Sequence, residues 1–217
     1  MSPGPGRIVN AEAVVLSRSD AGEADRLVSV FTELHGRMTV RFIGVNRPRA
    51  KLRALSEPLA RVELRLHLGG RQGAARAIGG RIIDSFPALR ADLRRTVEGL
   101  AMAEMLLRMT PEGNPSSAKY RLLVAGLSAL EAGPSAWAVT AFGLRLLDLA
   151  GVGLREAPAP GVDPGLWGDL HGRPFEHLSG LPFDAKAADP ALASLRRALE
   201  AEAGREIRSL AFLELTA

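Results

Sequence analysis

The sequence contains no cysteine, a single tyrosine and no long hydrophobic run, and these scarcities exclude several classes of protein. Without cysteine there is no disulfide framework, thiol nucleophile or cysteine-ligated zinc, which is consistent with a reducing compartment. No stretch approaches the roughly 18 to 20 continuous apolar residues of a membrane-spanning helix. The N-terminus MSPGPGRIVN also lacks the pattern of a secretory signal. We therefore expect a cytoplasmic protein with no membrane partner.

Side chains suited to catalysis or metal binding are also scarce. Asp163, Asp169, His171 and His177 form the one grouping that resembles a set of metal ligands, but their spacing matches no common metal site. The glycine-rich range 69–80 lacks the lysine and the serine or threonine of a phosphate-binding loop, so a hairpin connection is the better interpretation. Clustered carboxylates and an activated nucleophile are also missing. The sequence therefore predicts a protein that is not an enzyme and holds no metal or cofactor.

Basic side chains are present in number but are unevenly distributed. Residues 1–86 contain 14 basic and 8 acidic side chains, whereas residues 87–217 contain 14 and 16. Any electrostatic attraction to phosphate therefore belongs to the first part of the chain. Between Glu33 and Glu57 there is no acidic residue, and the basic residues there are Arg37, Arg41, Arg47, Arg49, Lys51 and Arg53.

Residues 8–86 show the period of two that is typical of β-strands. In the range 60–68, alanine, valine and leucine alternate with charged or polar side chains, which a helix could not place on one face. Comparable patterns predict strands at 11–17, 25–32, 37–42 and 75–83, with a helix-prone stretch at 51–56. Gly79 and Gly80 indicate a bulge or bend in the last strand. Five short strands with one helical stretch predict a small barrel of the OB type.

The strand at 37–42 has one apolar face and one basic face, and a loop follows it. The loop, 44–53, holds a glycine, an asparagine and a proline between basic residues, so we expect it to display its charges outward. Few aromatic side chains are available there to stack on bases, so binding of nucleic acid would depend on phosphate contacts. An acidic protein partner would suit the same charge, and a protein-interaction scaffold remains the alternative.

After Phe86 apolar residues recur at helical spacing. The stripe that predicts a helix over 87–110 consists of Leu89, Leu93, Val97, Leu100 and Leu107. Cap and proline signals predict further helices that begin at Asn114-Pro115, Ser135 and Asp189-Pro190. The range 151–188 holds seven glycines and five prolines, and we expect an irregular insertion there. The fold class is therefore α+β, with an OB-fold nucleic-acid-binding domain over 1–86 and a helical domain over 87–217.

These features, in this order, resemble the bacterial RecO family of recombination mediators. AEAVVLSRSDAGEADRLVSVFTELHGR and GVNRPRAKLRALSEPLARVELRL are similar to its N-terminal region, and TPEGNPSSAKYRLLVAGLSALEAGPSAW and LRLLDLAGVGL to its helical region. The resemblance implies a non-enzymatic role in DNA repair and recombination: strand annealing and RecA loading on single-stranded DNA coated by SSB. The implied partners are single- and double-stranded DNA, RecR and the acidic C-terminal tail of SSB, and the implied location is the nucleoid.

The resemblance also assigns roles to residues. DNA contact falls on the basic positions of the OB face and its loop, Arg37, Arg41, Arg47, Arg49, Lys51 and Arg53, and more weakly on Arg61 and Arg65 of the neighbouring strand. The SSB-tail site of relatives lies in the helical domain, where the candidates are Lys119, Arg121 and Arg145. Many relatives bear a four-cysteine zinc site after the third helix. This chain has no cysteine, so we expect 151–188 to be held by packing alone.

Overall fold

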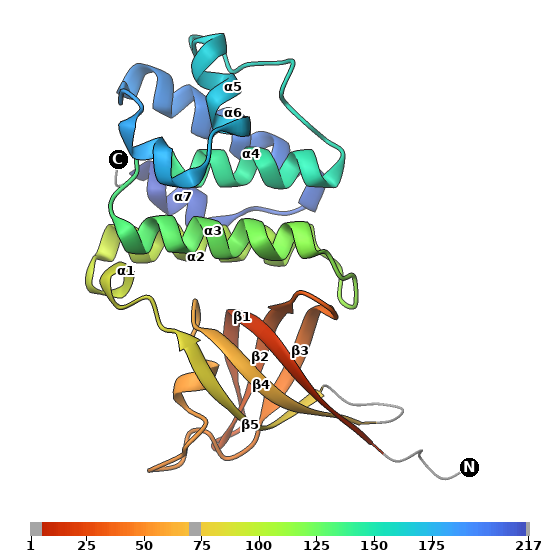
Figure 1. Cartoon of the computed structure of the whole chain (residues 1–217). Helices are drawn as coiled ribbons and strands as arrows, with labels where there is room; N and C mark the ends of the chain where they lie inside the picture. Colours follow the sequence, from red (N-terminus) through yellow and green to blue (C-terminus); the bar gives the residue numbers. More distant parts are fainter. Residues whose placement is uncertain (1–5, 70–74, 216–217) are drawn as a thin grey trace. The chain divides into compact units, whose positions relative to one another are not determined.

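The computed structural model describes residues 6–69 and 75–215, and its internal contacts divide the chain into two compact units (Figure 1). The first unit comprises Met1–Ser85 together with Thr110–Tyr120. The second comprises Phe86–Met109 and Arg121–Ala217. Residues 110–120 therefore belong with the strands by their contacts, although they lie inside the range of the predicted helical domain.

Five strands within the described residues close into a barrel in the order β1-β2-β3-β5-β4. Their bounds are β1 Arg7–Ala21, β2 Asp25–Thr32, β3 Gly36–Phe42, β4 Arg61–Leu68 and β5 Ala75–Asp84. Neighbours are antiparallel except β3 and β5, which are parallel. A closed five-stranded barrel of this kind is the OB architecture, so the predicted fold class is confirmed. Part of the predicted 69–80 connection, residues 70–74, lies outside the described residues.

The alternation of side chains explains why the barrel closes around an apolar core. Val28, Val30, Val40 and Leu64 point inward and are 0% exposed. Burial of each such side chain contributes about 1.5–3 kcal/mol to folding. The bulge predicted in β5 is confirmed, because the register with β4 shifts between Arg65 and Leu66.

Residues 43–60, which connect β3 to β4, lie at one end of the barrel (orange in Figure 1) and take part in its core. Val45 and Leu55 are 1% and 3% exposed and pack with the inward side chains of the strands. The helical stretch predicted at 51–56 forms as one short 3-10 turn, η1, over Ala54–Ser56. The connection is therefore part of the packed barrel and not a free excursion.

The second unit is helical. The elements after the barrel are α1 Pro87–Ala91, α2 Leu93–Met109, α3 Ser117–Ala132, α4 Ala138–Ala150, α5 Pro164–Gly172, η2 Phe175–Gly180, α6 Ala185–Ala203 and α7 Arg208–Leu215. Helix α4 is buried along most of its length, and α2, α5 and α6 pack against it. Gly126 of α3 permits a close approach, because a Cβ there would lie 2.8 Å from Met102 Sδ. None of the described helices has the length and apolar character needed to cross a bilayer.

The prediction of one continuous helix over 87–110 is wrong. The chain breaks at Asp92, whose φ and ψ of −113° and 121° are extended. The Asp92 carboxylate instead accepts a hydrogen bond from Arg95 N at 3.0 Å and caps α2. Because of this break, the buried face of α2 does not coincide with the predicted apolar stripe, and Leu93 of that stripe is 79% exposed.

The later helices also differ from the sequence-based expectation. Helix α3 begins at Ser117 and not at Asn114-Pro115, and α4 begins at Ala138 without a side-chain cap from Ser135. The segment 151–188 is more regular than its composition indicates, because it contains α5 and η2; the Asp163 side chain caps α5 by accepting from Leu166 N at 2.9 Å. The predicted start of a helix at Asp189-Pro190 is wrong. Helix α6 begins at Ala185, capped by Asp184, and Pro190 lies inside it.

Candidate nucleic-acid interface

The candidate interface is the connection 43–60, which we call the basic loop. Its apolar residues Val45 and Leu55 are buried in the barrel, whereas the basic residues between them are exposed. These exposed residues, the loop cations, are Arg47, Arg49, Lys51 and Arg53. Within residues 6–69 and 75–215, no acidic side chain forms an ion pair with any of them. The loop therefore presents, from an anchored main chain, four exposed positive charges without an ion pair to the described residues, and Arg47 alone of the four is among the charges that lower the pKa of Asp25.

Arg49 occupies a position of the loop where glycine is usual. Ala50 N donates to Arg47 O at 3.2 Å, Pro48 is the second residue of this turn, and Arg49 has a φ of 62°. This is the pattern of a type II turn, whose third residue favours glycine. The left-handed conformation costs a residue with a Cβ about 1–2 kcal/mol. Such strain is typical of a residue that is placed for its side chain.

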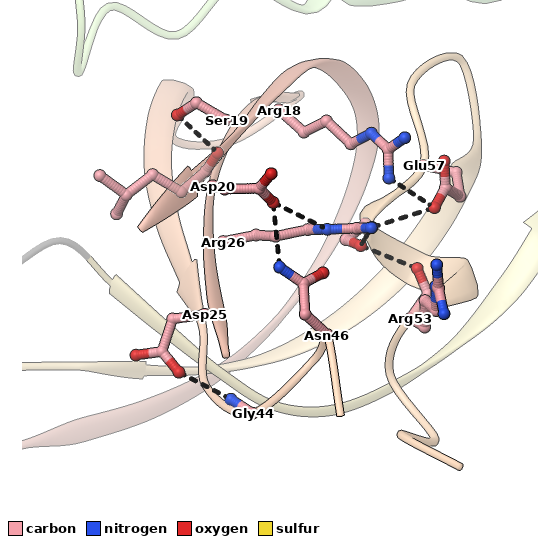
Figure 2. Close-up of polar contacts among 11 residues, drawn as sticks. Arg18, Ser19, Asp20, Asp25, Arg26, Gly44, Asn46, Arg53 and Glu57 are labelled. Atoms are coloured by element: carbon pink, nitrogen blue, oxygen red, sulfur yellow. Dashed lines mark hydrogen bonds and ion pairs between the residues drawn. The ribbon is translucent and has the colours of Figure 1, made fainter. Parts of the chain in front are cut away.

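The β1–β2 hairpin holds the start of the basic loop (Figure 2). Gly44 N donates to Asp25 Oδ1 at 2.8 Å, and Asn46 Nδ2 donates to Asp20 Oδ1 at 3.0 Å. The hydrogen bond from the Gly44 main chain, together with that from the Arg41 guanidinium, lowers the pKa of Asp25. Asp25 therefore remains an ionised acceptor for the loop at neutral pH.

Side chains of the barrel strands hold the end of the basic loop. The Glu57 clamp is our name for the four residues involved: Arg18 and Arg26 of the strands, and Ser56 and Glu57 of the loop. Arg26 Nη1 donates to Ser56 Oγ at 2.9 Å and to Glu57 Oε1 at 3.0 Å, and Arg18 Nη1 donates to the same Oε1 at 2.8 Å (Figure 2). Arg26 Nε also lies 3.7 Å from Asp20 Oδ1, which is close enough for an ion pair but too far for a hydrogen bond.

Arg26 is not among the predicted site residues, although the sequence contains a signal for it. Arg26 shares the inward parity of Val28 and Val30 in β2 and is only 5% exposed. A charged side chain in an inward-facing position needs polar partners at the barrel end, because an unpaired buried charge is costly. Those partners are supplied by residues of the loop, Ser56 and Glu57.

The basic face predicted for β3 is partly neutralised. Arg41 is exposed, but its Nη2 donates to Asp25 Oδ2 at 2.8 Å. Arg37 is half-buried, and its carbonyl accepts from Gly113 N at 2.9 Å in the segment 110–120. Glu112 of the same segment forms a short hydrogen bond with Thr39, which places a carboxylate on the face between the two arginines. The loop cations are all exposed and free of ion pairs with the described residues, so they offer more accessible positive charge than this face.

On β4 and β5 the candidates also differ from one another. Arg61 Nε donates to Glu12 Oε1 at 2.7 Å and is half-buried. Arg65 is exposed and makes no ion pair within the part of the chain that the structure describes. Arg76, which the sequence analysis missed, is exposed on β5 in register with Arg41 across the parallel pairing. Only knowledge of that β3–β5 pairing could have found it.

The three candidates for partner binding have different surroundings. Lys119 belongs to the first unit and is 9% exposed, and burial lowers its pKa. Arg121 is exposed on α3. Arg145 Nε donates to Leu170 O at 2.9 Å, and its guanidinium lies 4.5 Å from the centre of the Phe175 ring. Arg145 therefore holds α5 and η2 against α4, whereas Arg121 is available for contact.

Three of the four residues that resembled metal ligands, all except His177, have side-chain partners among the described residues. Asp163 caps α5, and Asp169 Oδ2 accepts from Arg173 at 2.9 Å. His171 Nδ1 lies 2.7 Å from Asp148 Oδ2. Across the described ranges, no group of three or more histidine, aspartate or glutamate side chains is arranged to hold a metal ion.

A closed five-stranded barrel with an exposed cationic loop, followed by a helical unit, defines a class of OB-fold proteins with a surface suited to polyanions. Two family models refine this class: "Recombination protein O N terminal" matches residues 7–86, and "Recombination protein O C terminal" matches residues 90–157. The chain belongs to the RecO family.

Similar proteins agree with this assignment. The DNA repair protein RecO of Pelotomaculum thermopropionicum is 30% identical over 145 residues, which are 67% of this chain and 56% of that protein. The protein of the same name from Pelobacter propionicus is 38% identical over 125 residues, 57% of this chain and 50% of the relative. That of Heliobacterium modesticaldum is 32% identical over 145 residues, 67% and 52%. The chain thus spans about half the length of these relatives.

Proposed function

We propose that this protein is a non-enzymatic mediator of DNA repair and recombination. It binds single- and double-stranded DNA through phosphate contacts, anneals complementary strands, and acts with RecR to assist RecA loading on SSB-coated DNA at the bacterial nucleoid. The observation that carries the proposal is the display of four exposed cations, none of them in an ion pair with the described residues, by a loop that is anchored in an OB barrel. Membership of the RecO family supports the same function.

The physical basis of the proposed binding is the release of counterions from the phosphate backbone. Each cation that neutralises a phosphate contributes to affinity regardless of the base, so the contacts suit annealing, which must act on any sequence. Arg65 on β4 and Arg76 on β5 are further exposed cations of the barrel. Because these side chains are arginines, they can also form bidentate contacts with phosphate oxygens.

The proposed protein partner is the acidic C-terminal tail of SSB. Among the three candidates in the sequence, Arg121 is the one whose guanidinium is both exposed and without a hydrogen bond or ion pair to the described residues. Arg145 is occupied by main-chain carbonyls, and Lys119 is buried. We therefore assign the tail contact to Arg121 first.

DNA binding is tested with bare oligonucleotides. Fluorescence titrations with single-stranded and duplex DNA over a range of salt, followed by annealing assays with and without SSB, should show binding that weakens as salt rises. Replacement of the four loop cations by alanine should abolish most of this DNA binding. The matched control removes four exposed cations of the helical unit instead, Lys186, Arg197, Arg205 and Arg208. No binding by the unaltered protein at low salt would favour the alternative, a scaffold for an acidic protein.

A further inference from the structure

The Glu57 clamp joins the end of the stretch that carries the loop cations to the barrel. Ser56 Oγ accepts from Arg26 Nη1 at 2.9 Å and donates to Arg53 O at 2.8 Å. Arg53 is itself one of the loop cations. Ser56 is 0% exposed, so this chain of hydrogen bonds is shielded from water, which strengthens it.

We propose that Glu57 and Arg26 are positioning residues for DNA binding, so that an acidic side chain strengthens the binding of a polyanion. This inference rests on the proposed function. Glu57 fixes Arg26 and Arg18 through one oxygen, Oε1, and Arg26 in turn fixes Ser56 and the main chain of Arg53. The cations are thereby held in place before DNA arrives.

The other attachments of the loop support preorganisation. Asp25 and Asp20 hold Gly44 and Asn46 at the start of the loop, and Val45 and Leu55 are buried in the barrel. Both ends of the stretch that carries the cations are therefore fixed. A loop that is ordered before binding loses less conformational freedom on binding, so release of the clamp should weaken affinity by about 3- to 10-fold.

Charge alone predicts the opposite effect for Glu57. If long-range electrostatic attraction were the only contribution to affinity, removal of an anion from the surface near bound phosphate should strengthen DNA binding. A comparison of Glu57→Ala with Glu57→Gln separates the two effects. Both variants remove the charge, but the glutamine amide retains an oxygen that can accept from Arg18 and Arg26.

The experiment measures three quantities for each variant: affinity for a single-stranded oligonucleotide at fixed salt, thermal stability, and hydrogen exchange of the amides at 44–56. The control is Glu63→Ala, because Glu63 pairs with Arg81 on the barrel and its loss removes the same charge without touching the loop. We expect Glu57→Ala to bind about 3- to 10-fold more weakly and to exchange faster at 44–56. Glu57→Gln should recover most of the affinity, and Glu63→Ala should bind at least as tightly as the unaltered protein.

Two results would overturn the inference: Glu57→Ala binding as tightly as Glu63→Ala, or equal losses in Glu57→Ala and Glu57→Gln. In either case the proposed function would still stand if the four-alanine loop variant loses binding. If that variant binds normally, the proposed function itself fails. Should Glu57→Ala not fold, Ser56→Ala interrupts the same chain of hydrogen bonds, and unchanged affinity in that variant would be decisive against positioning.

Discussion

The Tyr120 hydroxyl donates a hydrogen bond to Glu12 Oε1 at 2.7 Å and joins the start of α3 to β1 across 108 positions of the sequence. Arg61 Nε donates to the same oxygen at 2.7 Å. Burial alone would raise the pKa of Glu12, but the hydrogen bonds from Tyr120 and Arg61 lower it. Burial and the Glu12 carboxylate raise the pKa of Tyr120. The donor is therefore a neutral phenol and the acceptor an ionised carboxylate at neutral pH.

Tyr120→Phe should destabilise the first unit. The substitution removes one hydrogen bond to a charged acceptor, and because Glu12 is partly exposed and keeps Arg61 we expect a loss of about 1 kcal/mol in the free energy of unfolding. Urea denaturation monitored at neutral pH measures it. In a Glu12→Ala background, which has no acceptor for the hydroxyl, Tyr120→Phe should change the free energy of unfolding by less than about 0.5 kcal/mol. Equal losses in both backgrounds would mean that the hydroxyl does not act through Glu12.

The pH dependence of stability should include a contribution from Glu104. Burial raises the pKa of Glu104, but hydrogen bonds from the Ser209 side chain and main chain and from Arg108 outweigh burial and lower it. A carboxyl group with a lowered pKa in the folded state stabilises the protein fully above its unfolded-state pKa. That contribution is lost as the pH falls through the folded-state pKa.

Glu104→Gln tests this contribution. The variant should be less stable than the unaltered protein at pH 7, and the difference should shrink as the pH falls below the ordinary glutamate value of 4.5. Thermal unfolding from pH 7 to pH 3 measures the difference. A constant difference over that range would show that the ionisation of Glu104 does not contribute.

The sequence predicted the barrel well because strand formation there depends on a local pattern. The alternation of apolar side chains in 60–68 is visible without any partner, and β4 forms at Arg61–Leu68. Pairing between strands is not local, so neither the β3–β5 contact nor the covering of Arg37 by 110–113 was predictable. The loop cations could be predicted from the distribution of charge alone. Arg26 could be predicted only from its inward-facing position in the alternation of β2.

The helical unit was harder to predict because its start signals are ambiguous. The Asp-Pro pair at 163–164 begins α5, but the same pair at 189–190 lies inside α6. Proline is favoured at the first position of a helix, as at Pro164 in α5, but Pro190 is the sixth residue of α6. An Asp-Pro pair therefore does not by itself mark the start of a helix. The break at Asp92 then moved the buried face of α2 away from the predicted stripe.

Removal of the four loop cations should change the salt dependence of DNA binding, not only its strength. If each cation neutralises one phosphate of a single strand, the slope of log affinity against log salt should become less negative by about 3. Titrations at several salt concentrations give this slope. The control variant without Lys186, Arg197, Arg205 and Arg208 should keep the original slope; a parallel loss in the control would indicate net charge as the cause.

Arg145→Met should destabilise the second unit. The substitution leaves the Leu170 and Arg173 carbonyl oxygens without their donor, and we expect a loss of about 1.5–3 kcal/mol. Chemical denaturation measures this loss. Arg121→Ala is the control because that exposed side chain has no hydrogen bond or ion pair to the residues that the structure describes. Arg121→Ala should change the free energy of unfolding by no more than about 0.5 kcal/mol. Equal stability of Arg145→Met and the unaltered protein would show that Arg145 does not hold α5 and η2.

Arg49→Gly should separate stability from DNA binding. Glycine adopts the left-handed conformation of this turn without strain, but it also increases the freedom of the unfolded chain, so stability should be unchanged or higher by up to about 1 kcal/mol. DNA affinity should fall by about 2- to 5-fold, because one of the four phosphate contacts is lost. Thermal unfolding and a single-strand titration measure the two quantities in one preparation. Arg49→Lys should keep the charge and most of the affinity, so an equal loss of affinity in both variants would mean that the guanidinium group, and not the positive charge alone, is what DNA binding requires at this position.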